Sequence, residues 1–350
     1  MRFAIYGTGA VGGYLGARLT DGGHSVRYLA RPAWVDALRR RGLRLVEDGG
    51  AVDTPAPEAF VDAAQALREI DVVLLTVKAY DAASAADDLA KRLAPDVSVV
   101  SLPNGIGSEA TLGKALGPER IIAASLTTAV QTLEPGIIRI ERERGLGLAA
   151  GHALSRRLAE AFEAVGVRTR LYGVPDALKW SKLMTNMVAN ASSAILGWTA
   201  AAVMGHPGIF HLEAEALRET VRVMRALGLS PLALPGVRVD VLGRLLFLPS
   251  SWLRPVLGGI VSRGRGSKLP SLHRDIGRGR SEVYWLNGAV VAHGERAGVA
   301  APVNRLLTDV FDGLVRSVTP PEVFRDRPER LMEAAALAGV PGAARYNRPR

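Results

Sequence analysis

Three polar side chains at regular spacing are the first candidates for chemistry in this sequence. Lys182, Asn186 and Asn190 stand four residues apart in an otherwise largely apolar stretch, residues 178–190. A helix over this stretch puts all three on one face, each about 6 Å further along the axis. Asparagine is a poor helix former and a buried amide needs hydrogen-bonding partners, so a small polar substrate is one explanation of the pattern. An ordinary solvated helix edge is the other.

The chemistry that these residues favour is the reduction of a carbonyl group. A ketone that accepts a hydride develops negative charge on its oxygen, and a nearby ammonium group stabilises and protonates that oxygen. Lys182 is the natural candidate for this acid, and Lys179, one turn earlier, competes with it. The spacing alone does not separate the two lysines.

A glycine-rich turn at residues 7–12 predicts the source of the hydride. It has the pattern G-x-G-x-x-G, directly follows a strand-like run at Arg2–Tyr6 and begins a helix-like stretch. Glycines in this context allow a tight turn, a close approach of the backbone to a pyrophosphate, and binding of that anion at the helix N-terminus. The residues expected to bind a dinucleotide are Gly7, Thr8, Gly9, Ala10, Val11 and Gly12.

The end of the second predicted strand, Ser25–Leu29, indicates which dinucleotide binds. Proteins that bind NAD usually place an acidic side chain here, where it accepts hydrogen bonds from the ribose hydroxyls. This chain has Ala30-Arg31-Pro32 instead, so no acid repels a 2′-phosphate and Arg31 can pair with it. We therefore expect NADPH; the alternative is that Arg31 is an unrelated surface arginine.

Two further polar residues follow predicted strands. Lys78 comes after Asp71–Val77, and Asn104 comes after Val97–Leu102. In open α/β sheets the ligand lies outside the carboxyl ends of the strands. Together these two residues favour contact with the cofactor or the substrate, although either alone could be an ordinary loop residue.

The elements that carry these residues alternate between short β-branched runs and amphipathic stretches, which predicts an α/β domain with a parallel sheet covered by helices. Further strands are expected at Ile121–Ser125 and Arg168–Tyr172, with a helix around Ala153–Val165. Ile137–Ile140 and Gly145–Ala149 flank a charged turn and are expected to form a hairpin that finishes the sheet.

Beyond Gly173 the pattern becomes helical. Pro175-Asp176 suits a helix N-terminus, and further helices are expected at Phe210–Leu227, Glu282–Ala297 and Val303–Val318. The C-terminal residues 338–350 are rich in proline, glycine and arginine and are expected to form a flexible tail.

Composition narrows the class of protein. The chain has 350 residues, 48% of them hydrophobic, which is enough for two cores. It has no cysteine, so disulfides, thiolate metal sites and thiol catalysis are excluded. The six histidines show no spacing suited to a shared metal, and no metal is expected. No signal-like segment precedes the first strand, so a cytoplasmic protein is expected.

The net charge of +10 is unevenly distributed. Residues 1–150 carry 17 basic and 18 acidic groups, whereas residues 151–350 carry 27 and 16. The segment between Pro235 and Ser281 has nine basic groups and two acidic ones. An acidic ligand is therefore expected to be attracted to this segment first.

The chain resembles the ketopantoate reductase (2-dehydropantoate 2-reductase) family over about residues 1–315. The resemblance lies in the glycine turn, Thr76-Val77-Lys78-Ala79, Pro103-Asn104-Gly105, the Lys182/Asn186/Asn190 spacing, and Ser281-Glu282 followed by Leu286-Asn287-Gly288. It implies NADPH-dependent reduction of a 2-oxo acid to a 2-hydroxy acid, most directly 2-dehydropantoate to pantoate in pantothenate biosynthesis. It also implies an NADP-binding Rossmann-type domain (1–173) followed by an all-α substrate and catalytic domain (174–337).

The resemblance assigns roles to single residues. Lys182 matches the general acid of the family, which decides against Lys179. Asn186 and Asn190 match substrate contacts, and Asn104 matches a residue where substrate and nicotinamide meet. Glu282 matches an active-site acid, where a carboxylate could hold the Lys182 ammonium. Ser271 matches a contact with the substrate carboxylate.

The departures from the family are on the substrate side. The spacing from Asp275 to Glu282 is one residue shorter than expected, Tyr284 stands where the family usually has an acid, and Ala200 replaces a substrate-contacting asparagine. The basic segment Leu234–Lys268 is expected to be an insertion or a remodelled stretch.

Several alternatives follow. The same hydride chemistry could act on a bulkier or more anionic carbonyl compound, or the chain could be a non-catalytic NADPH-binding protein whose basic region binds an acidic partner. The apolar residues around Leu245–Leu248 and Trp252 suggest a lid or interdomain packing more than contact with a membrane surface. Nucleic acid is not expected as a partner, and the oligomeric state stays open, with a homodimer as one option.

Overall fold

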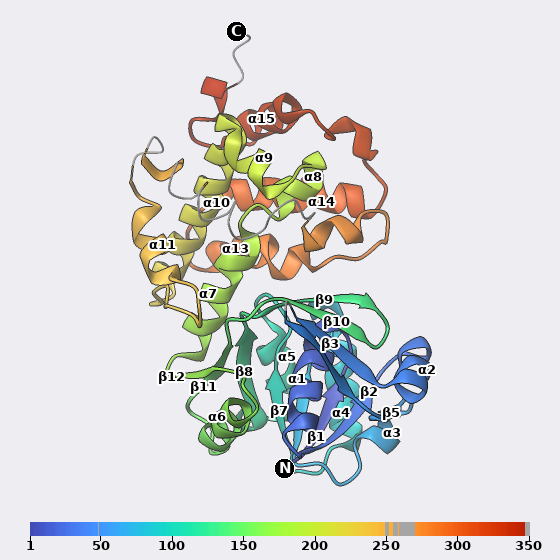
Figure 1. Ribbon diagram of the computed structural model, residues 1–350. Coiled ribbons are helices and arrows are strands. Elements are labelled where there is room, and N and C mark those ends of the chain that lie inside the picture. Colours follow the sequence, from blue (N-terminus) through green and yellow to red (C-terminus); the bar gives the residue numbers. More distant parts are fainter. Residues whose placement is uncertain (48, 249–251, 255–257, 259–269, 347–350) are drawn as a thin grey trace. The chain divides into compact units, whose positions relative to one another are not determined.

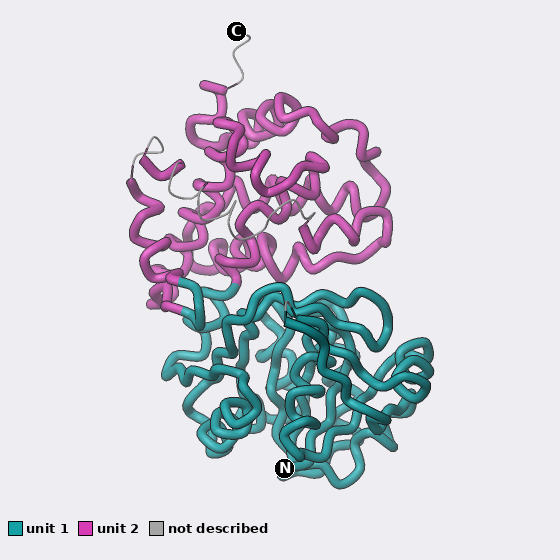
Figure 2. Tube along the Cα trace, viewed as in Figure 1, with its two compact units in different colours: residues 1–182, 234–237 teal, residues 183–233, 238–350 magenta. Residues whose placement is uncertain are grey.

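The computed structural model describes residues 1–47, 49–248, 252–254, 258 and 270–346, which divide into two compact units (Figure 2). The first unit comprises Met1–Lys182 and Leu234–Val237, and the second comprises Leu183–Ala233 and Arg238–Arg350. The division falls inside helix α7 (Pro175–Met187), whereas the boundary expected at Gly173 lies where the strands end.

A sheet of eight strands forms the centre of the first unit (Figure 1), in the order β12-β11-β8-β7-β6-β1-β2-β5 among the described residues. Its strands are β1 (Arg2–Tyr6), β2 (Ser25–Leu29), β5 (Glu58–Phe60), β6 (Val72–Leu75), β7 (Ser98–Ser101), β8 (Ile121–Leu126), β11 (Leu146–Ala149) and β12 (Thr169–Tyr172). The strands from β5 to β8 along this order are parallel, and β11 is antiparallel to β8. The expected α/β class is confirmed, with some strands one to three residues shorter than predicted.

Helices cover both faces of this sheet, because its strands are apolar on both sides. Phe3 and Ile5 of β1 belong to a core with side chains of α1 and α6, whereas Ala4 belongs to a second core with side chains of α4 and α5. The helical segments of this unit, besides α7, are α1 (Ala10–Asp21), α2 (Pro32–Arg41), α3 (Ala63–Ala66), η1 (Ala79–Asp81), α4 (Ala82–Arg92), α5 (Ser108–Leu116), η2 (Pro118–Arg120) and α6 (Ser155–Ala164).

A second, four-stranded sheet shows that the hairpin predicted from Ile137–Ile140 and Gly145–Ala149 is wrong. The smaller sheet has the order β4-β3-β10-β9, with β4 (Gly50–Thr54), β3 (Leu43–Glu47), β10 (Ile137–Arg142) and β9 (Ala129–Glu134). Strand β10 pairs with β9 and β3, whereas β11 lies in the larger sheet between β8 and β12. The true hairpin turns at Pro135-Gly136, where Gly136 has a φ of 83°.

Two threonines fix the passage from one sheet to the other. The hydroxyl oxygen of Thr128 accepts hydrogen bonds from the backbone N–H groups of Arg144 and Gly145 at 3.1 and 3.0 Å. The hydroxyl of Thr127 lies within hydrogen-bonding distance of the carbonyls of Gly145 (2.9 Å) and Pro235 (2.8 Å). The charged turn, which is predicted to close a hairpin, therefore connects β10 of the smaller sheet to β11 of the larger sheet. Thr127 and Thr128, which follow β8, stabilise it.

The described part of the second unit is helical, which confirms the all-α prediction (Figure 1). Its elements are α8 (Ala191–Leu196), α9 (Ala200–Gly205), α10 (Pro207–Ala226), α11 (Val239–Leu245), η3 (Ser271–Asp275), η4 (Glu282–Trp285), α13 (Asn287–Arg296), α14 (Pro302–Val315), η5 (Pro321–Val323), α15 (Pro328–Leu337) and η6 (Ala343–Tyr346). Helix α10 is buried along most of its length and contacts α9, α13, α14 and α15. The single helix expected at Glu282–Ala297 is interrupted at Leu286, where η4 gives way to α13.

The expected flexible tail is partly packed. Val340 and Ala343 are buried, and η6 contacts α10 and α15. His211 of α10 lies 2.7 Å from the carbonyl oxygen of Pro341 and packs its ring against Tyr346. Val340, Ala343 and Tyr346 therefore contact the helices of the second unit, whereas residues 347–350 lie outside the described part of the chain.

The basic segment Leu234–Lys268 is described only in part, since residues 249–251, 255–257 and 259–268 lie outside the described ranges. Leu234–Val237 forms a tight turn that belongs to the first unit, and α11 follows it in the second. Phe247 is exposed and stacks under the guanidinium of Arg225 at 4.6 Å.

Candidate active site

The glycine turn after β1 has a conformation that requires glycine at position 7. Gly7 has a φ of 99°, which favours glycine, and a Cβ there would lie 2.7 Å from Cγ1 of Val77. The turn leads to Gly9, which precedes the first residue of α1. A side chain at position 7 is therefore excluded by both the backbone conformation and the neighbouring chain.

The other two glycines of the turn have different surroundings. A Cβ at Gly12 would lie 2.5 Å from Oγ1 of Thr76 and 2.6 Å from Cγ2 of Ile5, so glycine lets α1 pack closely on β1 and β6. The Thr76 hydroxyl also donates a hydrogen bond to the Gly7 carbonyl at 2.8 Å. A Cβ at Gly9 would meet nothing within 4 Å. The protein therefore leaves no space for a side chain at Gly7 or Gly12. At Gly9 the space is open, and a pyrophosphate would approach there.

Thr8 fixes the turn to the end of β2. Its buried hydroxyl donates a hydrogen bond to the Leu29 carbonyl at 3.0 Å, and the N–H groups of Gly7 and Thr8 reach the same oxygen. Ala10 and Val11 form the first turn of α1. The side chain of Thr8 is therefore occupied in holding the turn, and the N–H groups at the start of α1 remain the part suited to a phosphate.

The remaining predicted cofactor residues lie at the same edge of the sheet. Arg31 is exposed and stands immediately before α2, two residues after β2. Lys78 follows β6 and Asn104 follows β7, and both are exposed. Because β1, β2, β6 and β7 are parallel, the residues that follow them share one edge, and the strand order changes direction there between β1 and β6.

Lys179 is committed to the protein interior. The residue is 4% exposed, and its Nζ donates a hydrogen bond to the Pro103 carbonyl at 2.7 Å. The same Nζ lies 2.9 Å from Oε1 of Glu109, in the first turn of α5. Lys179 therefore holds the loop that carries Asn104 and is engaged as a structural cation, which supports Lys182 as the acid.

Helix α7 carries Lys182 and Asn186 one turn apart, but it ends at Met187. Ala189 has a φ of 46°, and Asn190 lies in the turn that leads to α8. The prediction that one helix carries all three residues on one face is wrong, because a left-handed residue breaks the helix before Asn190. Lys182 and Asn186 are half-buried, whereas Asn190 is 4% exposed.

The helix break brings Asn190 to Ser271, another predicted substrate residue. The side-chain amide nitrogen of Asn190 donates to the backbone carbonyl of Asn186 at 2.9 Å and lies 3.4 Å from the Ser271 hydroxyl. Its amide oxygen accepts from the backbone N–H of Leu272 at 3.4 Å. In the second unit the Asn190 side chain therefore links the main chain of Asn186 to the Ser271 side chain.

Glu282 stands at the start of η4 and is 4% exposed. The preceding Ser281 donates a hydrogen bond to Asp275 at 2.9 Å, and its oxygen accepts one from the N–H of Val283 at 3.2 Å. Asp275 ends η3, the same element that begins with Ser271. This bond between Ser281 and Asp275 fixes the Glu282 segment to the Ser271 segment.

The departures from the family pattern have distinct environments. Ala200 is buried at the start of α9, whereas Tyr284 is 48% exposed. Partial burial and the neighbouring Asp312 raise the pKa of Tyr284 above its usual value. Tyr284 is therefore a neutral phenol at a position where the resemblance leads us to expect a carboxylate.

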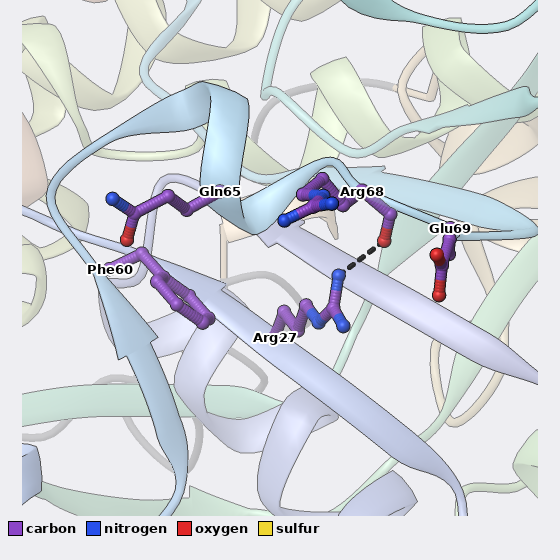
Figure 3. Close-up of a pocket in the computed structure, with 5 residues that line it drawn as sticks. All are labelled: Arg27, Phe60, Gln65, Arg68 and Glu69. Carbon is purple, nitrogen blue, oxygen red and sulfur yellow. Dashed lines mark hydrogen bonds between the residues drawn. The ribbon is translucent and has the colours of Figure 1, made fainter.

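A separate hollow of about 390 Å³ lies in the first unit, lined by Arg27, Phe60, Gln65, Arg68 and Glu69 (Figure 3). Arg27 donates a hydrogen bond to the Arg68 carbonyl within it. Arg68 and Glu69 precede β6, whereas the predicted cofactor residues follow their strands. The hollow includes none of those residues.

Two family models match the chain: ketopantoate reductase PanE/ApbA over residues 3–151 and ketopantoate reductase PanE/ApbA C terminal over residues 176–315. The chain belongs to the ketopantoate reductase family. A 2-dehydropantoate 2-reductase of Halobacterium salinarum is 28% identical, with the match covering 89% of this chain and 97% of the relative. It follows that this chain is an NADP-dependent oxidoreductase that uses NADPH.

Solved structures agree on the fold. A PanE/ApbA family ketopantoate reductase from Ralstonia eutropha JMP134 is 29% identical, with a TM-score of 0.78 over 91% of this chain and 99% of the other. A D-mandelate dehydrogenase with NADH and anilino(oxo)acetate is 20% identical, with a TM-score of 0.75 over 91% and 99% of the two chains. Both likenesses show that the chain shares its fold with these proteins.

NADPH suits the residues of the first unit. The open Cβ direction at Gly9 leaves room for a pyrophosphate, and the exposed Arg31 suits a 2′-phosphate. No helix among the described residues is long and apolar enough to cross a membrane.

Two features of the candidate site are not predicted from the sequence. One is the structural role of the Lys179 side chain, and the other is the burial of Glu213. Glu213 accepts a hydrogen bond from the Ala189 N–H. A charged residue in an amphipathic helix gives no sign of burial from its type alone. The available signal is the close spacing of three glutamates and one arginine within residues 213–219.

Proposed function

We propose that the chain reduces 2-dehydropantoate to pantoate with NADPH, with Lys182 as the general acid. The observation that carries this proposal is the pair Lys182 and Asn186, one turn apart on α7, in a chain that belongs to the ketopantoate reductase family. NADPH, when bound, supplies a hydride to the carbonyl carbon of the substrate. The ammonium of Lys182 gives its proton to the carbonyl oxygen, which becomes the hydroxyl of the product.

The other residues of the proposal bind and orient the substrate. Asn104 stands at the carboxyl edge of the parallel sheet, where it suits a contact with both substrate and nicotinamide. Asn186 and Ser271 offer an amide and a hydroxyl to the carboxylate of the substrate, and Asn190 supports them through its own hydrogen bonds. Glu282 is the acid assigned to hold the Lys182 ammonium.

A second candidate is the same chemistry on a different 2-oxo acid. Ala200 offers no amide and Tyr284 no carboxylate, in contrast to the pattern expected of the family. Such changes favour a substrate that is bulkier or more anionic than 2-dehydropantoate.

Steady-state kinetics with NADPH and a panel of 2-oxo acids separates the two candidates. Turnover of 2-dehydropantoate at a higher kcat/KM than of benzoylformate, 2-oxoglutarate or 2-oxoisovalerate supports the first. Negligible turnover of 2-dehydropantoate together with good turnover of another member supports the second. Lys182→Ala is the control: it should bind NADPH normally and lose about 10²–10⁴-fold in kcat.

A further inference from the structure

Ala189 has a backbone conformation that an L-residue with a side chain rarely adopts. Its φ is 46°, and it is completely buried. The left-handed conformation is unfavourable for alanine, so the surrounding structure must hold it in place. It matters for the site, because it ends α7 after Met187 and takes Asn190 out of the helical line of Lys182 and Asn186.

The group that holds Ala189 is the carboxylate of Glu213. Glu213 lies in α10 and is 3% exposed. One carboxylate oxygen accepts the Ala189 N–H at 2.6 Å, and the other accepts the hydroxyl of Ser192. The two donors stand on either side of Asn190 in the chain. A buried carboxylate is retained only when such hydrogen bonds stabilise it, so the turn and the carboxylate depend on each other.

The turn at Ala189 orients the side chain of Asn190. The Asn190 amide meets the Asn186 carbonyl and the Ser271 hydroxyl with its nitrogen, and the Leu272 N–H with its oxygen. A rotation of the turn would therefore displace the amide from η3, the element that begins with Ser271. The contacts run in one series, from Glu213 through Ala189 and Asn190 to Ser271.

We infer that Glu213 is a positioning residue of the substrate site, which sets the orientation of Asn190 and Ser271 by holding Ala189 in its left-handed conformation. The inference rests on the proposed function for the role of Ser271 toward the substrate carboxylate. Glu213 itself has no part in the hydride or proton transfer. Its loss should weaken binding of the oxo acid more than it slows the chemical step.

The kinetic test compares Glu213→Gln with Glu215→Gln. Glu215 is a matched control, since it is a buried glutamate of the same helix whose carboxylate pairs with Arg218 and Arg222. In Glu213→Gln an amide replaces the charged acceptor, so the KM of the oxo acid should rise about tenfold. The KM of NADPH should not change, and kcat should fall by no more than about threefold. In Glu215→Gln all three constants should stay near those of the wild type.

A rescue separates this role from general support of the fold. Glycine adopts a positive φ without the penalty that alanine incurs. Adding Ala189→Gly to Glu213→Gln should therefore return the KM of the oxo acid to within about threefold of the wild type. An unchanged KM in Glu213→Gln, an equal rise in Glu215→Gln, or the absence of rescue would each overturn the inference.

Hydrogen–deuterium exchange provides a readout that does not depend on turnover. In Glu213→Gln the amides of residues 188–192 and 271–275 should exchange faster than in the wild type, whereas in Glu215→Gln they should not. Unchanged exchange at residues 271–275 would overturn the positioning role even in an active enzyme. If exchange changes as expected but the wild type reduces no 2-oxo acid, the proposed function fails and the inferred contact does not.

Discussion

Arg31 lies exposed at the start of α2, just past the end of β2. In a Rossmann-type domain the adenosine ribose of the bound dinucleotide lies at this position. Arg31→Asp should shift the preference from NADPH toward NADH, because a carboxylate repels the 2′-phosphate and accepts hydrogen bonds from a free ribose. The ratio of kcat/KM values for the two cofactors checks this. Arg68→Asp is the control, since Arg68 lines the separate hollow and should leave the ratio unchanged.

Lys179 and Glu109 form a largely buried ion pair, with side chains that are 5% and 23% exposed. Lys179→Met should destabilise the protein by about 2 kcal/mol, because it leaves Glu109 and the Pro103 carbonyl without their cation. Urea unfolding of the single variant measures this loss.

The double variant Lys179→Met/Glu109→Gln tests whether the pair is the cause. It should be more stable than the sum of the two single changes predicts, since no uncompensated carboxylate remains. Strict additivity would show that Lys179 acts through its alkyl packing and not through the pair.

At the scale of elements, Gly9 and Gly12 of the nucleotide turn should respond differently to alanine. Gly12→Ala forces a methyl against Thr76 and Ile5 and should cost about 1–3 kcal/mol of stability. Gly9→Ala adds a methyl in open space, so stability should change by no more than about 0.5 kcal/mol while the KM of NADPH rises. Unfolding curves and KM values of the two variants are the measurements. An unchanged KM in Gly9→Ala would place the pyrophosphate elsewhere.

The sequence predicted the elements whose signals are local. Strands of continuous apolar residues, the glycine turn and the helix N-terminus at Pro175 are written in a few neighbouring residues, and each is found. The hairpin was misplaced because Gly145–Ala149 and Ile137–Ile140 lie close in sequence, while their partners β8 and β3 do not. Pairing between distant strands has no signal in a single stretch of sequence.

The residues of the candidate site stay predictions. They follow from residue type and from the resemblance, and the structure adds that the Asn190 side chain bonds to the Asn186 main chain and to Ser271. The helix break before Asn190 was not predicted, because the residue in the left-handed conformation is an alanine and the acid that holds it lies 24 residues away. Tertiary contact, not local preference, determines that turn.

At the scale of the whole molecule, stability should depend on pH through Glu219. This buried carboxylate accepts hydrogen bonds from the N–H groups of Val303 and Asn304 and from the Asn304 side chain. Burial raises the pKa of Glu219 from 4.5 to about 7. The folded state therefore keeps a proton that the unfolded chain has lost between these values, so this stabilisation is complete below about pH 4.5 and is lost as the pH rises through 7.

The change should be on the order of 3 kcal/mol, and Glu219→Gln should remove it. Urea unfolding between pH 4.5 and 8 compares the slopes of the two proteins. Glu333→Gln on α15 is the control, since Glu333 is exposed and pairs only at the surface with Arg330. Equal slopes in the wild type and Glu219→Gln would rule out this carboxyl as the source.

The return of Leu234–Val237 to the first unit affects how the protein could be divided. The chain passes between the units after Lys182, again before Leu234 and again after Val237, so no single cut separates them. A fragment that ends at Lys182 lacks the Pro235 carbonyl, which accepts a hydrogen bond from Thr127, and Gly236, which lies next to the Arg144 side chain. A stand-alone nucleotide-binding module for transplantation into another enzyme would therefore have to include residues Leu234–Val237, attached through a linker.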